Sequence, residues 1–326
     1  MKCLVTGASG FTGGHLALEL VRQGHTVRAL VRPGSRTDHL ASSGIELVHG
    51  HLTTRQDVLA AASGCEQIFH IAAAFRTAGH PDSYYYDVNV GGTTNVLEAA
   101  RAAGCERVIH CSTGGVHGHI EHPPANETYR AKPDDAYQRS KVEGERIVNA
   151  AITNGLRAVI VRPGAIYGEG DLRFLKLFRS IGKKRFLMIG PGTTRLHLVH
   201  VQDLVDGILL SARSENALGE TFLLAGPDAP TLNEIVARAC EVFGISPPKL
   251  RVPVWPVYAA GWLCEMVCVP LRIDPPLHRR RVGFFTHHRE FDIAKARRLL
   301  GYSPKVGMRE GIERTIRWYD AQGLLR

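Results

Sequence analysis

The chain has 326 residues, 44% of them hydrophobic, which is enough for one large or two modest domains with a sizeable core. Its formal net charge is +9, from 40 basic and 31 acidic residues. This balance favours an anionic cofactor or substrate, or weak attraction to an acidic membrane surface. The basic run His278–Arg281 lacks interleaved aromatic residues and no nucleic-acid motif is present, so we expect no nucleic-acid partner.

The sequence also predicts a cytoplasmic protein. The first apolar run begins at Lys2, which leaves no room for a signal peptide. The most apolar stretch, Val252–Ile273, is interrupted by three prolines and Glu265, so no membrane span is expected. Seven cysteines, an odd number without C-x-x-C pairs, indicate reduced thiols.

Short apolar runs alternate with helical patterns through the first half of the chain. The predicted strands are Cys3–Val5, Thr26–Val31, Glu46–His49, Gln67–Ala72, Arg107–Cys111 and Ala158–Arg162, and the predicted helices are Gly14–Arg22, Arg55–Ala62, Gly91–Ala103 and Tyr137–Asn154. Such alternation predicts an α/β fold with a doubly wound parallel Rossmann sheet.

A glycine-rich turn follows the first strand directly. The spacing T-G-x-x-G-x-x-G over Thr6–Gly13 lies between a strand and a helical pattern, where doubly wound folds bind a dinucleotide pyrophosphate. Gly7 permits the tight turn, Gly10 lets backbone N–H groups approach phosphates, and Gly13 allows close packing of the helix. A plain strand-to-helix turn is the alternative interpretation.

Regular alternation stops after about residue 163, where glycine and proline become frequent. Later strands are predicted at Val199–Val201 and Thr221–Leu224, and later helices at Thr231–Phe243, Asp292–Leu300 and Glu310–Asp320. We therefore expect a dinucleotide-binding domain over residues 1–163, with 195–225 returning to it. Residues 164–194 and 226–326 are expected to form a smaller, interleaved substrate domain.

Tyr137 and Lys141 are four residues apart, so they share one face of a helix. A free tyrosine titrates near about 10, and an adjacent positive charge favours the phenolate, which makes the phenol a usable acid/base. A surface pair is the alternative. The hydroxyls of Ser112 and Thr113, at the end of the fifth predicted strand, favour the catalytic interpretation because ligands bind beyond that end of a parallel sheet.

The histidines and cysteines do not predict a metal site. His117, His119 and His122 form one cluster and His287 and His288 another, but a third ligand at metal spacing is missing. We expect no metal, and we expect Cys264 and Cys268, which share a helical face, to be buried thiols.

Taken together, the motifs resemble an extended short-chain dehydrogenase/reductase of the NAD-dependent epimerase/dehydratase type, nearest to 3β-hydroxysteroid dehydrogenase and dihydroflavonol 4-reductase-like members. The matching segments occur in order along the chain: Thr6–Gly13, Phe69–Ala73, Asn89–Val96, Ser112–Gly118, Tyr137–Lys141, Arg162–Gly168, His200–Asp203 and Phe291–Pro304. The resemblance implies hydride transfer between a nicotinamide cofactor and a substrate.

It also implies roles for individual residues. Thr113 is the match to the position that binds the substrate oxygen, with Ser112 the less favoured neighbour. Tyr137 is the implied acid/base and Lys141 its electrostatic partner. The implied cofactor contacts are Gly7, Ser9, Gly10, Phe11, Thr12, Gly13, Arg32, His51, Leu52, Ala72, Ala73, Tyr137, Lys141, Pro163 and Ile166. Relatives often form dimers, which implies a homodimer through Gly91–Ala103 and Tyr137–Asn154.

Cofactor choice depends on the end of the second predicted strand. NAD-binding members place a carboxylate there for the ribose hydroxyls. Here no carboxylate is present, and Arg32 and Arg36 suit a 2′-phosphate. The sequence therefore favours NADP, with NAD as the alternative. His51 stands where the family often has an Asp that contacts adenine.

Three observations bear on the substrate. Dehydratase relatives carry an acidic pair where this chain has Gly114-Gly115, so dehydration is not expected. Ala165 replaces an Asn common in nucleotide-sugar epimerases, and Arg195 is one residue out of the sugar-nucleotide pattern. Val252–Ile273 is apolar, which favours a lid over a lipophilic alcohol or ketone (steroid-, flavanonol- or terpenoid-like), although weak peripheral membrane association is an alternative. A nucleotide-sugar 4-epimerase and a catalytically silent NADP-binding redox sensor stay open.

Overall fold

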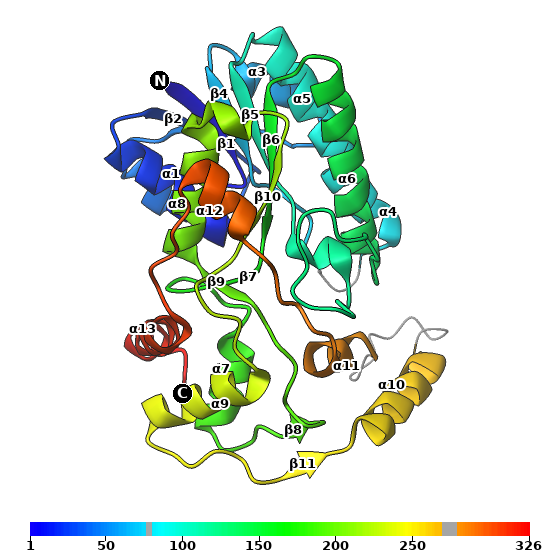
Figure 1. Ribbon diagram of the computed structural model, residues 1–326. Helices are drawn as coiled ribbons and strands as arrows, with labels where there is room; N and C mark the ends of the chain where they lie inside the picture. Colours follow the sequence, from blue (N-terminus) through cyan, green and yellow to red (C-terminus); the bar gives the residue numbers. More distant parts are fainter. Residues whose placement is uncertain (76–79, 269–278) are drawn as a thin grey trace.

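A computed structural model describes residues 1–75, 80–268 and 279–326 (Figure 1). Residues 269–273 of the apolar stretch and His278 of the basic run lie outside the described residues. In the part that is described, no helix is both long enough and apolar enough to cross a bilayer.

The core of the molecule is a seven-stranded parallel sheet in the order β10-β6-β5-β4-β1-β2-β3, which confirms the predicted doubly wound α/β fold. Its strands are β1 (Lys2–Thr6), β2 (Thr26–Val31), β3 (Glu46–His49), β4 (Gln67–His70), β5 (Arg107–Cys111), β6 (Ala158–Pro163) and β10 (Thr221–Leu224). The central strands β4 and β5 are buried along their whole length, as expected for a sheet covered on both faces.

Helices cover both faces of this sheet (Figure 1). One layer holds α1 (Phe11–Arg22), α8 (Val201–Arg213) and α12 (Ala294–Leu300), and the other holds α3 (Arg55–Ala62), α5 (Gly92–Ala102) and α6 (Ala136–Thr153). An apolar cluster lies between the helices and the sheet on each face. The first cluster contains Leu16 and Ile208, and the second contains Val96 and Val148. Shorter helices, α2 (Asp38–Ala41) and α4 (Asp82–Tyr86), lie in connections.

A smaller unit lies below the sheet in Figure 1 and has its own apolar core. It contains α7 (Leu175–Gly182), β8 (Met188–Ile189), α9 (Leu232–Phe243), β11 (Arg251–Val252), α10 (Val254–Cys268), α11 (Arg279–Thr286) and α13 (Met308–Ala321). Strand β8 pairs with β11, and β7 (Ala165–Tyr167) pairs with β9 (Leu198–His200) between the two units. Helix α9 begins with a capping box formed by Thr231 and Glu234.

The course of the chain between the units differs from the sequence prediction in one respect. Residues 226–326 were all expected in the substrate domain. However, Phe291, Ile293 and Leu300 are buried in the core under the large sheet, and α12 packs against β10. This segment therefore lies with the sheet, because its apolar side chains cover the face that α8 leaves open.

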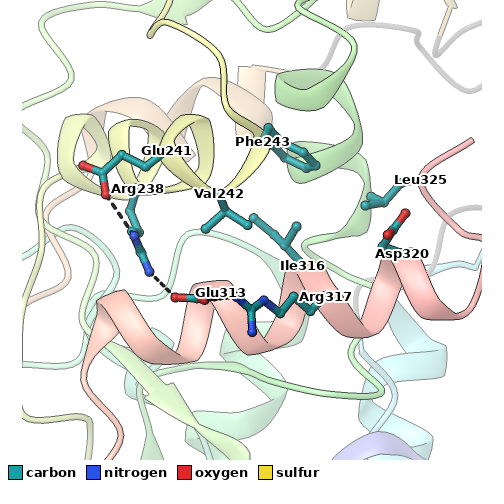
Figure 2. A pocket seen from close by; sticks show the side chains of 9 residues that line it. All are labelled: Arg238, Glu241, Val242, Phe243, Glu313, Ile316, Arg317, Asp320 and Leu325. Atoms are coloured by element: carbon teal, nitrogen blue, oxygen red, sulfur yellow. Dashed lines mark hydrogen bonds and ion pairs between the residues drawn. The ribbon is translucent and has the colours of Figure 1, made fainter.

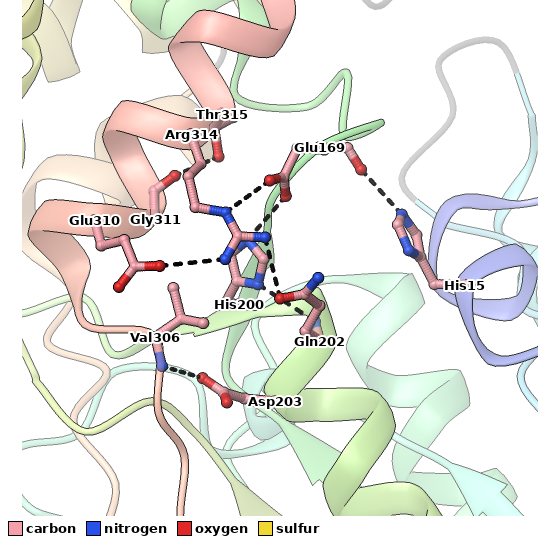
Figure 3. A network of polar contacts seen from close by, with 10 residues as sticks. All are labelled: His15, Glu169, His200, Gln202, Asp203, Val306, Glu310, Gly311, Arg314 and Thr315. Atoms are coloured by element: carbon pink, nitrogen blue, oxygen red, sulfur yellow. Dashed lines mark hydrogen bonds and ion pairs between the residues drawn. The ribbon is translucent and has the colours of Figure 1, made fainter. Parts of the chain in front are cut away.

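A polar network fastens helix α13 to the rest of the molecule (Figure 3). The carboxylate of Glu169 accepts hydrogen bonds from His200 Nε2 at 3.0 Å and from Arg314 Nε at 2.8 Å. Arg314 also donates to Gln202, and the Glu169 carbonyl bonds His15 on α1. The hydrogen bond from buried His200 holds the pKa of Glu169 down at about 2.

We expect Glu169→Gln to weaken this junction. A carboxylate with a depressed pKa stabilises the fold above its ordinary pKa of 4.5, and this contribution is lost as the pH falls towards about 2. Replacement by the neutral amide should lower the free energy of unfolding at pH 7 by about 2 kcal/mol, measured by urea denaturation. Glu310→Gln, which removes a more exposed partner of Arg314, should change it by less than about 0.5 kcal/mol. Equal losses of unfolding free energy in the two variants would contradict the stabilising role of the Glu169 carboxylate.

Candidate active site

A cavity of about 1490 Å³ opens beyond the carboxyl ends of the central strands. Its walls come from the turn after β1, the ends of β2, β4 and β5, and helix α6. This is the edge at which doubly wound sheets bind their ligands. Most of the sequence-predicted site residues line it: Gly7, Ser9, Gly10, Phe11, Thr12, Gly13, Arg32, His51, Leu52, Ala72, Ala73, Tyr137, Lys141 and Ile166.

The glycine turn is packed too closely to accept side chains. A Cβ on Gly13 would lie 2.2 Å from the Gly7 carbonyl oxygen, and one on Gly7, which has a φ of +78°, would lie 2.7 Å from the Ala72 nitrogen. The turn closes with a hydrogen bond from the Gly10 N–H to the Gly7 carbonyl at 3.0 Å, and α1 starts at the next residue. The open helix N-terminus faces the cavity, so these residues fit a dinucleotide pyrophosphate.

One part of the cavity wall is basic. Arg32 directly follows β2 and is exposed. His51 also lines the cavity, in a loop that Asp57 holds by accepting a hydrogen bond from the His51 N–H at 2.7 Å. No acidic residue follows β2 within the loop 32–37. The arrangement therefore offers positive charge where the ribose of a bound dinucleotide would lie.

Helix α6 presents Tyr137 and Lys141 to the cavity. Its first turn is fixed by Asp135, whose carboxylate accepts a hydrogen bond from the Gln138 N–H at 2.8 Å. Lys141 is almost completely buried, and its ammonium donates to the Cys111 carbonyl at 2.8 Å. Burial lowers the pKa of Lys141. The Lys141 ammonium is thus buried one helical turn from Tyr137, and both residues line the cavity.

The two hydroxyls after β5 are placed differently from the expectation. Ser112 lines the cavity, and its Oγ is buried without a hydrogen-bond partner among the described residues. Thr113 is not among the lining residues, because its Oγ1 accepts a hydrogen bond from the Gly115 N–H at 3.0 Å and caps the following turn. Of the two, Ser112 therefore borders the cavity, and the side chain of Thr113 is engaged in the cap. Pro163, at the end of β6, also does not line the cavity.

The buried side chain of Asn89 links two segments that border the site. Its side-chain amide accepts from the Ala74 N–H at 2.7 Å and donates to Ser140 Oγ on α6 at 2.9 Å. The residue lies in a π-helical turn, Asp87–Gly91, immediately before α5. One buried amide thus fixes the segment after β4 against the helix that carries Tyr137.

The outer wall of the cavity contains residues that were not predicted from the sequence. Phe75 contacts Tyr137 edge-on with ring centroids 5.0 Å apart, and the Arg173 guanidinium lies 5.5 Å from the ring centre of Phe11 and 5.8 Å from that of Phe75. Asp171 accepts a hydrogen bond from Arg173 at 2.6 Å. Phe75, Asp171 and Arg173 lie in connecting segments, so no periodic signal in the sequence could have brought them together.

Two histidines are buried side by side beneath the site. His70 and His110 are register partners on β4 and β5, with ring centroids 5.2 Å apart. His70 is bonded by Thr6 and Thr93, whereas neither ring nitrogen of His110 has a partner among the described residues. Burial lowers the pKa of His70 to about 3 and also lowers that of His110, with Lys141 adding to both shifts.

This pair predicts sensitivity to mild acid. A histidine kept neutral in the folded state takes up a proton only on unfolding, so stability is lost as the pH falls below 6.5. Between pH 7.5 and pH 5 one such group accounts for about 2 kcal/mol. His110→Leu should therefore reduce the acid-induced loss of unfolding free energy by about that amount, in urea titrations at both pH values. If the unfolding free energy of His110→Leu depended on pH as that of the unmodified chain does, His110 would not be the source of the acid sensitivity.

A second cavity, of about 480 Å³, lies between α9, α13 and the C-terminal residues (Figure 2). Arg238 is paired there with Glu241 at 3.0 Å and with Glu313, and Arg317 also pairs with Glu313. Because these charged side chains pair with one another, we interpret this cavity as part of the contact between α9 and α13 and not as a ligand site. Among the described residues, no group of three His, Cys, Asp or Glu side chains could hold a metal ion.

The fold and this site define a dinucleotide-dependent enzyme with a tyrosine–lysine pair. The profile of the NAD dependent epimerase/dehydratase family matches residues 3–225. The chain belongs to this family, and it is an NAD(P)-dependent enzyme of the extended short-chain dehydrogenase/reductase type.

Individual relatives cover almost the whole chain. It is 32% identical to a putative dihydroflavonol 4-reductase of Synechocystis sp., over 99% of this chain and 95% of that protein. It is 31% identical to a 4-hydroxy-2-methyl-3-oxo-4-farnesyl-3,4-dihydroquinoline-1-oxide ketoreductase of Stigmatella aurantiaca, over 96% and 95%. The crystal structure of gox2253 superposes with a TM-score of 0.86 at 28% identity and covers 99% of both chains.

Proposed function

We propose that this chain is an NADPH-dependent reductase that interconverts a ketone and a secondary alcohol on a lipophilic substrate. The observation that carries the proposal is that Tyr137, Lys141 and Ser112 all line the cavity that also holds the glycine turn. Proton transfer, charge stabilisation and dinucleotide binding are thereby available at one place.

The reaction follows from these side chains. The nicotinamide cofactor, when bound, supplies the hydride that adds to the carbonyl carbon. Ser112 donates a hydrogen bond to the carbonyl oxygen and shares the negative charge that develops there. Tyr137 then gives its phenolic proton to that oxygen. The buried ammonium of Lys141 favours the resulting phenolate, and two of its N–H groups remain beyond the one donated to Cys111.

The outer part of the cavity supports a lipophilic substrate. Phe75, Tyr84, Val88 and Ile166 line it, and such side chains bind by burial of apolar area. A relative that is named as a ketoreductase of a farnesylated compound fits this class. Dehydration has no support, since a Cβ on Gly114 would lie 2.5 Å from the Phe291 ring and leaves no room for an acidic side chain.

The proposal is tested by oxidation of NADPH with a panel of steroid, flavanonol and terpenoid ketones, run beside UDP- and dTDP-sugars. Turnover of ketones with no change in the sugars is the expected result. Turnover of the sugars alone would assign the chain as a nucleotide-sugar epimerase. Tight NADPH binding without turnover of any compound would assign it as a redox sensor.

The preference for NADPH is a separate prediction. A bidentate contact between Arg32 and a 2′-phosphate is worth about 2 kcal/mol. Arg32→Ala should therefore raise the KM for NADPH about 30-fold while it leaves the KM for NADH unchanged. Arg36→Ala should raise the KM for NADPH less than Arg32→Ala does, because Arg36 is in the same exposed loop but does not line the cavity. Equal KM values for NADPH and NADH in the unmodified protein would rule out the preference.

A further inference from the structure

Helix α10 (Val254–Cys268) is an apolar helix that lies mostly in solvent. Glu265 is its single charged residue, and Gly261 is its single buried residue. Trp255 is 74% exposed, Val267 59% and Met266 55%. A helix that is apolar all round normally lies in a protein core or in a membrane, so this exposure requires an explanation.

The apolar surface continues beyond the helix. Strand β11 leads directly into α10, and β8 pairs with β11 at the same lower edge of the molecule (Figure 1). Leu250 beside β11 and Leu187 beside β8 are 63% and 48% exposed. The base of α10 is held in place, because Val254 lies against the Gly190 turn after β8 and α10 packs on α11. We call this edge, with α10 and both strands, the α10 surface.

Positive charge borders the α10 surface. Lys183, Lys184 and Arg185 precede β8, and Lys249 and Arg251 lie at β11, and all five are exposed. The sequence has no Asp or Glu within 183–191 or 245–264. Trp and Tyr side chains prefer the boundary between lipid chains and headgroups, and lysine and arginine bind anionic headgroups.

We propose that the α10 surface docks on an anionic lipid bilayer. The helix has 15 residues and so spans only about 22 Å, which is shorter than the roughly 30 Å hydrocarbon core; it therefore lies in the headgroup boundary instead of crossing it. A second copy of the chain fits less well, because a contact between two such surfaces would bring five basic side chains from each copy together with only one acidic residue from each, Glu265. Docking does not depend on the proposed reaction, but it would place the substrate domain beside dissolved lipophilic ketones.

Flotation with lipid vesicles tests docking without substrate or cofactor. The full chain should float with phosphatidylcholine vesicles that contain about 30% phosphatidylglycerol, float less with phosphatidylcholine alone, and be released at about 0.5 M salt. The variant Trp262→Ser/Leu263→Ser changes two exposed side chains and should weaken binding at least about tenfold. Leu172→Ser, at a position 61% exposed outside the α10 surface, should bind as the unmodified chain does.

Tryptophan fluorescence supplies a second measurement. Brominated lipid should quench the emission of Trp255 and Trp262, and quenching should disappear in Trp255→Phe/Trp262→Phe, which retains only Trp318 on α13. Failure of the unmodified chain to bind anionic vesicles, or equal binding of the Ser/Ser variant, would overturn the proposal. So would a loss of dimer in that variant by sedimentation, since a second copy would then occupy the surface. Ketone turnover is measured separately, so each proposal can fail alone.

Discussion

Tyr137→Phe should lower kcat for ketone reduction by about 10³-fold, because general acid catalysis contributes about 10²–10⁴ to such rates. The aromatic ring is retained, so its edge-on contact with Phe75 and the packing of α6 should be unchanged. The proton donor is the only group removed. The dissociation constant for NADPH, measured by fluorescence titration, should therefore stay within about twofold.

Tyr86→Phe is the matched control, since Tyr86 lies on α4 with its side chain 37% exposed and does not line the cavity. Its turnover should equal that of the unmodified chain. Retention of most activity in Tyr137→Phe would remove the proposed acid/base. A parallel loss of NADPH binding would indicate that the phenol holds the cofactor instead of transferring a proton.

The large sheet could be predicted from the sequence because its strands are short apolar runs separated by single helices. β2, β3 and β5 begin and end at the predicted residues, and α3 does as well. The glycine turn could be predicted for a related reason. The backbone packs so closely there that Gly7 and Gly13 have no room for a Cβ. Only glycine fits these positions, so the glycine spacing in the sequence indicates the turn.

Features that depend on tertiary contacts could not be predicted. The strand β7 (Ala165–Tyr167) has only three residues and directly follows Pro163 and Gly164, so no periodic pattern forms there. The buried pair of His70 and His110 arises only when β4 and β5 come into register. The exposure of α10 is likewise invisible in the sequence, because an apolar run gives the same pattern in a core, a lid or a membrane-facing helix.

The choice between Ser112 and Thr113 as the substrate-binding hydroxyl also depends on tertiary structure, which the sequence motif does not show. Motif spacing selects Thr113, but spacing does not say which of two adjacent side chains faces a cavity at the end of a strand, since successive residues of a strand point to opposite sides. In the structure Ser112 is among the residues that line the cavity, and Thr113 caps the next turn. We therefore expect the variants Ser112→Ala and Thr113→Val to differ in their kcat and in their free energy of unfolding.

Ser112→Ala should lower kcat by about 10²-fold, the usual effect of losing one donor to a developing oxyanion. Thr113→Val keeps the shape of the side chain and removes only the oxygen that accepts from Gly115, so kcat should fall by less than about tenfold while the free energy of unfolding drops by about 1 kcal/mol. Steady-state kinetics and urea denaturation of both variants separate the two roles. If Thr113→Val were instead the variant with the larger loss of kcat and unchanged stability, the motif position would be right, and the capping bond would have to break when cofactor and substrate bind.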